Sequence, residues 1–257
     1  MEPTQHHPSE TETEARARQR DEIEAELQRR TRELESRNEE LVQFASVASH
    51  DLRAPLRTIK GFASLLEQEL SATSAQQREY LAEIQEGINR MELLITDLLS
   101  YTQASSQELT IIPTDLNQIV SLVLKDLQLE IEETTAEIQL DPLPTIMADP
   151  IQMRQLYQNL LSNAIKFRRE LPLRIHIGRR QTAVDTRFFV ADNGIGIDPA
   201  QTDRIFDMFQ RLHTSADYEG TGIGLAICRK IVERHQGQIS VESTPGTGTV
   251  FLFSLKS

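Results

Sequence analysis

The 257-residue chain has a single cysteine, no tryptophan and few aromatic residues of any kind. Cys228 has no partner for an internal disulfide, which is typical of a protein in a reducing compartment. No stretch approaches the roughly 18 consecutive apolar residues of a membrane span, and the N-terminus lacks a signal-peptide pattern. With aromatics scarce, the cores must be built mainly from Leu, Ile and Val. We therefore expect a soluble, cytoplasmic chain without a membrane span.

Positive charge is also in deficit, because the formal net charge is −12 and the pI is about 5.0. Such a chain lacks the basic face that attracts nucleic acid or anionic lipid, so neither is expected as a partner. The length allows one large or two modest domains.

The N-terminal part predicts a disordered tail and then a signalling helix. Residues 1–18 are polar and acidic, whereas 19–48 contain neither Gly nor Pro. Leu27, Leu34 and Leu41 occupy one position of a heptad seam, and Arg30 and Arg37 interrupt the other. This pattern predicts a marginal, dimeric coiled coil. A single solvated, charged helix is the alternative.

Residues 42–103 predict a helical hairpin. Apolar residues recur every three or four positions in each half, with a turn near Ser71–Ser74 between them. A hairpin buries too little alone, and two hairpins form a four-helix bundle, so we expect a homodimer. The first helix, about 41–70, and the second, about 75–102, have these predicted apolar faces: Leu52, Leu56, Ile59, Ala63 and Leu66; and Leu81, Ile84, Ile88, Met91, Ile95, Leu98 and Tyr101.

His50 falls outside the apolar face of the first helix and should point to solvent. Asp51 follows it directly, and Pro55 should bend the helix nearby. Imidazole has a reference pKa of about 6.5, so much of it is neutral at physiological pH, and a neighbouring carboxylate can accept one ring proton. The pair is a candidate nucleophile, although a lone surface histidine usually has no such role.

A polar linker ends near Thr110, and 111–257 mix helices and strands in the manner of an α+β sandwich. The long loop 192–224 is expected to be functional. The predicted helices are 116–133, 150–168 and 225–235, and the predicted strands are 137–140, 173–179, 186–191, 238–243 and 247–255.

The helix 150–168 carries two stripes. One is apolar and should be buried, and the other repeats a polar residue once per turn. Amide oxygens can ligate Mg²⁺ and a lysine can meet phosphate oxygens, although for this helix taken alone an ordinary polar face is the simpler explanation of the second stripe. The two stripes are Met153, Leu156, Leu160, Ala164 and Phe167; and Gln155, Asn159, Asn163 and Lys166.

Two glycine-containing segments complete the candidate site. Asp192 ends a predicted strand and can accept a hydrogen bond from an exocyclic amine, while Gly194 and Gly196 let the backbone approach a flat ring; an ordinary Asn-Gly turn is the alternative. The run Gly220-Thr221-Gly222-Ile223-Gly224 opens into a helix at Leu225, where free N–H groups bind phosphate. It is neither a Walker A nor a Rossmann loop.

Five motifs in this order resemble a sensor histidine kinase of two-component signalling. They are Ser49–Leu56 for the phosphoacceptor box, Asn159–Phe167 for the N box, Asp192–Gly196 for G1, Ile205–Phe209 for the F box and Gly220–Leu225 for G2. The resemblance covers about 42–255. It implies an α+β protein: an N-terminal coiled coil, a hairpin that forms a four-helix bundle as a dimer, and an α/β sandwich of the Bergerat ATPase type.

The resemblance also implies roles for individual residues. His50 would attack the γ-phosphate of ATP, and Asp51 would orient the ring and take its proton. Asn163 would hold Mg²⁺ with Asn159 beside it, and Lys166 would meet phosphate. Asp192 would read adenine in a pocket shaped by Gly194 and Gly196. The G2 residues Gly220, Thr221, Gly222, Gly224 and Leu225 would close over the phosphates.

The resemblance implies partners as well. The phosphoryl group would pass to an aspartate of a response regulator. No sensory domain is recognised, so we expect either a fragment of a larger sensor or a kinase governed by a partner on the N-terminal coil. Phe209–His213 is similar to phytochrome-type kinases. Two alternatives stay open: a nucleotide-binding pseudokinase scaffold, and a Bergerat ATPase that is not a kinase.

One position departs from the family pattern. Four residues after the histidine, where the family commonly has Thr or Asn, this chain has Ala54, which cannot form a side-chain hydrogen bond. We therefore expect weak phosphatase activity towards the phosphorylated regulator.

Overall fold

The computed structural model describes residues 23–24, 26–31, 52–53, 55–66, 75–106, 108–181, 186–210 and 220–256. The chain divides into two compact units, 1–44 and 45–257. In the first unit the described residues are helical, and Glu26 accepts hydrogen bonds from Arg29 and Arg30 at 2.9 and 2.8 Å. These bonds hold the pKa of Glu26 at about 2. Ile23 and Leu27 are exposed, so the coiled coil stays a prediction.

The hairpin in the second unit joins a helical segment, 52–53 and 55–66, to α2 (Ala75–Ser106). Leu56 and Ala63 of the first segment pack against Ile88 and Ile95 of α2. Outside this contact, Lys60 pairs with Glu92 at 2.6 Å. None of the described helices is long and apolar enough to cross a membrane.

Only part of each predicted apolar face is buried in the single chain. Helical periodicity marks one face but does not say how much of it a single neighbouring helix covers. Leu56 and Ala63 of the first helix are buried, as are Leu81, Ile88 and Ile95 of α2. The remaining members of the predicted faces are exposed or half-buried. The exposed members are Leu52, Ile59 and Leu66 in the first helix and Ile84 and Met91 in α2.

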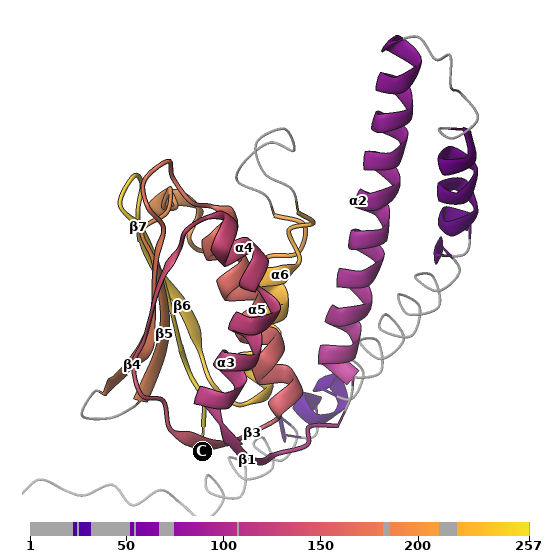
Figure 1. The fold of residues 1–257 in the computed structure, drawn as a ribbon. Coiled ribbons are helices and arrows are strands. Elements are labelled where there is room, and N and C mark those ends of the chain that lie inside the picture. The colour runs from indigo at the N-terminus through magenta and orange to yellow at the C-terminus, as the bar shows by residue number, and fades with distance from the viewer. Residues whose placement is uncertain are drawn as a thin grey trace, which may run out of the picture. The chain divides into compact units, whose positions relative to one another are not determined.

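A five-stranded mixed sheet with the order β2-β4-β5-β7-β6 forms one layer of the C-terminal domain. β2 and β4 are parallel, and every other pair is antiparallel. α3, α5 and α6 lie together on one face of the sheet (Figure 1). The strands are β2 (Glu137–Leu140), β4 (Arg174–Gln181), β5 (Thr186–Asp192), β6 (Ile239–Thr244) and β7 (Gly248–Ser254).

The predicted helix 116–133 is wrong in one respect, because it is two helices. α3 (Leu116–Asp126) ends at Leu127, and α4 (Gln128–Glu133) follows. No Gly or Pro marks the break. The backbone of Leu127 leaves helical geometry at φ −96° and ψ 15°, and its side chain is buried in the core whereas α4 buries no residue.

Two short strands were not predicted. β1 (Ile112–Asp115) and β3 (Thr145–Ala148) pair antiparallel in a separate two-stranded sheet. Pro113 and Pro144 argue against strands in a sequence, but an isolated pair has free edges where proline is tolerated. In this antiparallel register the start of α3 lies beside Pro144, whereas the start of α5 lies beside Thr110, at the other end of the pair.

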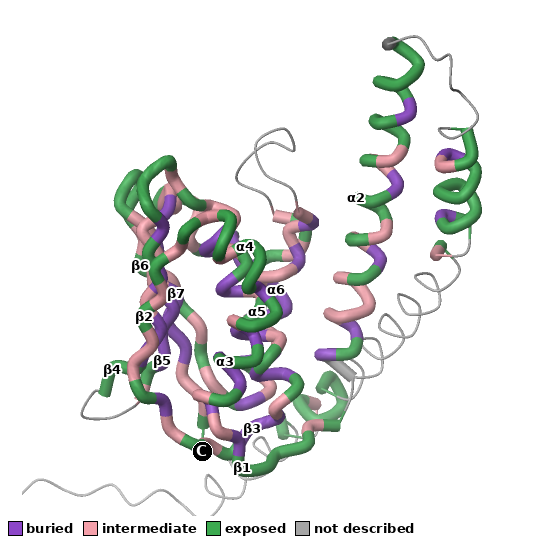
Figure 2. Tube along the Cα trace, in the orientation of Figure 1, coloured by how far each residue is buried: buried purple, intermediate pink, exposed green. Residues whose placement is uncertain are grey.

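α5 (Pro150–Lys166) is the helix at the centre of the core. Asp149 caps it by accepting from the backbone N–H groups of Ile151 and Gln152, and Pro150 fits the first turn. Met153, Leu156 and Leu160 are fully buried. Figure 2 shows that buried and less buried positions alternate along α5. Phe167, predicted in the same stripe, is only half-buried because the helix has ended before it.

Candidate functional site

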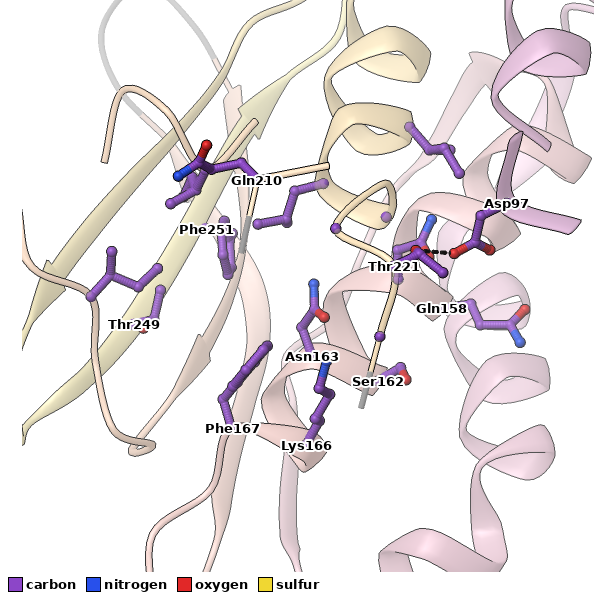
Figure 3. Close-up of a pocket in the computed structure, with 18 of the residues that line it drawn as sticks. Asp97, Gln158, Ser162, Asn163, Lys166, Phe167, Gln210, Thr221, Thr249 and Phe251 are labelled. Atoms are coloured by element: carbon purple, nitrogen blue, oxygen red, sulfur yellow. Dashed lines mark hydrogen bonds between the residues drawn. The ribbon is translucent and has the colours of Figure 1, made fainter. Parts of the chain in front are cut away.

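A cavity of about 630 Å³ opens beside α5. Sites for small molecules have roughly 300–1,000 Å³, so a nucleotide can be accommodated. Its walls come from α5, the turn after β5, the segment before α6 (Gly224–Arg234) and part of α2 (Figure 3). The segment 211–219, which lies between two of these walls in sequence, is outside the described residues.

One wall is the polar stripe of α5. Gln155, Asn159, Asn163 and Lys166 all line the cavity, one turn apart. The amide nitrogen of Asn159 is buried and its side chain lies beside the buried Cys228, while its Oδ1 lies beside Gly224. The ammonium of Lys166 lies 4.4 Å from the centre of the Phe167 ring.

Asp192 lines the cavity at the end of β5. Its Oδ1 accepts a hydrogen bond from the Gly194 N–H at 2.8 Å, and burial raises its pKa from 3.8 to about 6. The carboxylate also accepts a hydrogen bond from the Thr249 backbone N–H, and it lies in a poorly solvated part of the cavity wall. At neutral pH the group is mostly ionised, and ionised acceptors form the stronger hydrogen bonds.

The two glycines after Asp192 have different surroundings. Gly196 lines the cavity with φ +74°, a conformation that favours glycine. Gly194 is not among the cavity-lining residues. A side chain on Gly194 would collide with the Phe167 carbonyl, which explains the glycine by the close packing of the turn against the end of α5. Its predicted role in shaping the pocket stays a prediction.

The glycine-rich segment forms the opposite wall. Gly220, Thr221, Gly222, Gly224 and Leu225 all line the cavity. Gly220 and Gly222 have φ values of +142° and +75°, and no side chain caps the start of α6. Uncapped N–H groups at a helix start are suited to bind an anion.

α2 contributes residues that the sequence did not predict. Leu93, Asp97 and Ser100 line the cavity, and the Thr221 hydroxyl donates a short hydrogen bond to Asp97 (Figure 3). Burial raises the pKa of Asp97. In sequence, Asp97 is one more charged residue beside an apolar stripe, and only the packing of α2 brings it to the glycine-rich segment.

The predicted nucleophile lies outside the described residues, as do Asp51 and Ala54. No group of three or more His, Cys, Asp or Glu side chains able to hold a metal occurs in the described ranges. The remaining metal candidates of the cavity are the amide oxygens of Asn159 and Asn163, which are hard ligands of the kind that Mg²⁺ accepts together with water and phosphate.

The fold and cavity define a nucleotide-binding ATPase domain behind a helical hairpin, and comparison with known families agrees. Residues 148–257 match the histidine kinase-, DNA gyrase B- and HSP90-like ATPase family. Residues 40–107 match the His kinase A (phospho-acceptor) domain. By these two domains the chain belongs to the sensor histidine kinases of two-component systems.

Several curated relatives are similar over most of this chain. Cyanobacterial phytochrome A of Nostoc sp. is 46% identical over 87% of the chain and 29% of its own length. The methanogenesis regulatory histidine kinase FilI of Methanothrix harundinacea is 36% identical over 89% of the chain and 26% of its own length. The chain thus spans less than a third of the length of these relatives.

Solved structures show the same fold. The structure of full-length ShkA in complex with AMPPNP matches 83% of this chain, and the match covers 45% of the ShkA chain. The TM-score is 0.63 and the sequence identity is 30%. The structure of histidine kinase ThkA in complex with the response regulator protein TrrA matches 83% of this chain and 60% of the solved chain, with a TM-score of 0.57. Its 24% identity supports the fold alone.

Proposed function

We propose that the protein is a histidine kinase that phosphorylates His50 with ATP and passes the phosphoryl group to a response-regulator aspartate. The observation that carries the proposal is the convergence of the α5 amides, Lys166, Asp192 and the uncapped start of α6 on one cavity. These groups come from three separate segments, and each suits a different part of ATP.

The base and the phosphates would meet opposite walls. Asp192 would accept from the adenine amine beside Gly196. The N–H groups of Gly220–Leu225 and the ammonium of Lys166 would meet the phosphates, and Asn159 and Asn163 would hold the Mg²⁺ that neutralises phosphate charge. Phosphoryl transfer depends mainly on such positioning and charge stabilisation.

His50 would attack the γ-phosphorus through one ring nitrogen. The bond to the bridging oxygen breaks and ADP leaves, while Asp51 takes the proton from the other ring nitrogen. The phosphorylated ring is then the donor to a regulator. ThkA is recorded in complex with a response regulator, and a partner of that kind is proposed here by analogy.

A homodimer is proposed from the exposed apolar residues of the hairpin. Leu52, Ile59 and Leu66 and, on α2, Ile84 and Met91 are about half exposed in the single chain, at 44–54%. A second hairpin would cover them in a four-helix bundle. The proposal extends to a cytoplasmic location and to control by an upstream sensory module, which the relatives' greater length accommodates.

The test is incubation with γ-labelled ATP and Mg²⁺. Wild type should acquire acid-labile, alkali-stable label, and His50→Gln should acquire none. Binding of nucleotide without label would favour a pseudokinase scaffold. Release of phosphate without label on the protein would favour an ATPase that is not a kinase.

Phosphatase activity is the second measurement. Ala54 offers no hydrogen bond to an attacking water. Labelled regulator should therefore keep its phosphate for nearly as long with the protein and ADP as without them. Ala54→Thr, which restores a hydroxyl, should shorten that lifetime, and rapid loss with wild type would contradict the expectation.

A further inference from the structure

The turn Asp192–Gly196 is held from two sides. The Ile195 N–H donates to the Phe167 carbonyl at the end of α5 at 2.9 Å. The Gly246 N–H, at the tip of the β6–β7 hairpin, donates to the Ile195 carbonyl at 2.7 Å. The position of the turn therefore depends on two elements that are distant in sequence.

Arg169 joins these elements with one side chain. Its Nε donates to the Asn193 carbonyl at 2.8 Å, and its Nη1 donates to the Gly246 carbonyl. The guanidinium presents donors in a fixed planar arrangement, so the two carbonyls are held at a set distance from each other. A lysine can donate to either carbonyl but has no such geometry.

Asn193 completes the arrangement from its own side chain. Its Oδ1 accepts from the Arg174 N–H at 2.8 Å, and its Nδ2 donates to the Pro172 carbonyl at 2.9 Å. The residue directly after Asp192 is thus fixed through its carbonyl by Arg169 and through its amide by the strand start. The Asp192 carboxylate itself accepts from the Gly194 N–H at 2.8 Å and from the Thr249 N–H, so its position depends on this same turn and on β7.

We propose that Arg169 is a positioning residue for base recognition: by holding the Asn193 and Gly246 carbonyls, it sets where the Asp192 carboxylate meets the exocyclic amine of adenine. Arg169 is not among the residues that line the cavity, so it acts through the turn and not by touching the nucleotide. The inference rests on the proposed function, in which Asp192 reads the base.

The experiment compares ATP with inosine triphosphate, which has a carbonyl where adenine has its amine. The ratio of the two dissociation constants on the full chain reports recognition of the base edge that carries the amine, including N1, which is protonated in inosine and is an acceptor in adenosine. We expect Arg169→Ala to lower the preference for ATP by about tenfold, as loss of a well-placed bond to a charged group does. Arg169→Lys should lie between Ala and wild type.

A structural role alone would give a different result. General loosening of the fold would weaken both nucleotides together and leave the ratio unchanged, and that outcome would overturn the proposal. Arg168→Ala is the matched control, because Arg168 is the neighbouring arginine and donates at 3.2 Å to the Ile165 carbonyl near the end of α5, away from the turn. It should keep the wild-type ratio.

Asp192→Asn separates this inference from the function on which it rests. If Asp192→Asn keeps the wild-type ratio, Asp192 does not read the amine and the proposed role of the turn fails. If Asp192→Asn abolishes the preference and Arg169→Ala keeps it, only the positioning role fails. Should Arg169→Ala not fold, Arg169→Lys decides, since a wild-type ratio there refutes the need for the paired bonds.

Discussion

At the scale of single residues, ionisation of Asp192 has opposite effects on the stability of the fold and on nucleotide binding. Its folded pKa of about 6 lies above the ordinary value of 3.8 because burial disfavours the charged form. Relative to the unfolded chain, the folded protein without nucleotide therefore favours the protonated form of Asp192. Ionisation weakens the empty fold, and this destabilisation is absent below about pH 4 and complete above about pH 6.

Asp192→Asn should therefore stabilise the nucleotide-free protein above pH 6. The expected gain at pH 7.5 is about 3 kcal/mol, because the pKa rises from 3.8 to about 6 and each pKa unit corresponds to about 1.4 kcal/mol. Thermal unfolding without nucleotide at pH 7.5 and pH 4.5 measures it, and the gain should shrink at the lower pH. A variant less stable than wild type at pH 7.5 would contradict this reasoning.

The same pKa predicts how nucleotide binding depends on pH. An ionised carboxylate accepts the amine more strongly, so affinity should be constant above about pH 6 and fall as pH drops below it. Titration of ADP binding from pH 5 to pH 8 is the measurement. Asp192→Asn should bind weakly and show no such step; a step of equal size in that variant would assign it to another group.

At the scale of elements, the start of α5 is held by one carboxylate. Asp149 accepts at Oδ1 from Ile151 and Gln152 and at Oδ2 from the Thr110 N–H at 3.0 Å. Its own N–H donates to the buried His235 at 3.1 Å. One residue thus connects the linker, the helix of the N box and the end of α6.

Asp149→Ala should lower the free energy of unfolding by about 2 kcal/mol, since a helix cap contributes about 1 kcal/mol and the bond to Thr110 is also lost. Chemical denaturation measures the change. Asp149→Asn is the control, because an amide oxygen can still cap the helix. If Ala and Asn were equally stable, the cap would not be the source of the stabilisation.

At the scale of the second unit, α2 and the nucleotide cavity share a contact. Asp97 accepts from Thr221, and Arg234 of α6 donates to the Ala104 carbonyl near the end of α2 at 2.7 Å. The Thr221 hydroxyl has one proton and cannot donate at once to a carboxylate and to a phosphate. Docking of α2 and binding of a triphosphate should therefore compete.

Asp97→Ala should tighten ATP binding by roughly three- to tenfold, because it frees the hydroxyl and removes a negative charge beside the phosphate end. Ser100→Ala is the control: it also lines the cavity from α2, one turn further on, and carries no charge. Calorimetric titration of both variants with ATP measures the two dissociation constants, and that of Ser100→Ala should stay close to the wild-type value. Weaker binding in Asp97→Ala would show that the carboxylate assists the nucleotide.

Much of the fold follows from local pattern. The predicted strand 137–140 is confirmed to the residue, and the predicted helix 150–168 differs from α5 by two residues at one end. These segments are read correctly because periodicity and capping are local properties of a chain. β1, β3 and the break at Leu127 are missed because each depends on a partner far away in sequence.

The sequence by itself determined the order of the domains and which polar residues repeat on one face of α5. Helical periodicity fixes that Asn159, Asn163 and Lys166 share a stripe, whatever packs nearby. Only the tertiary structure decided that Asp192, Gly196 and Gly220 line the same cavity as this stripe, and that Gly194 does not. It also decided that Asp97 lines the cavity and that Arg169 holds the turn after Asp192. Those placements depend on the sheet register and on helix packing, and both are set by contacts between segments that no local pattern encodes.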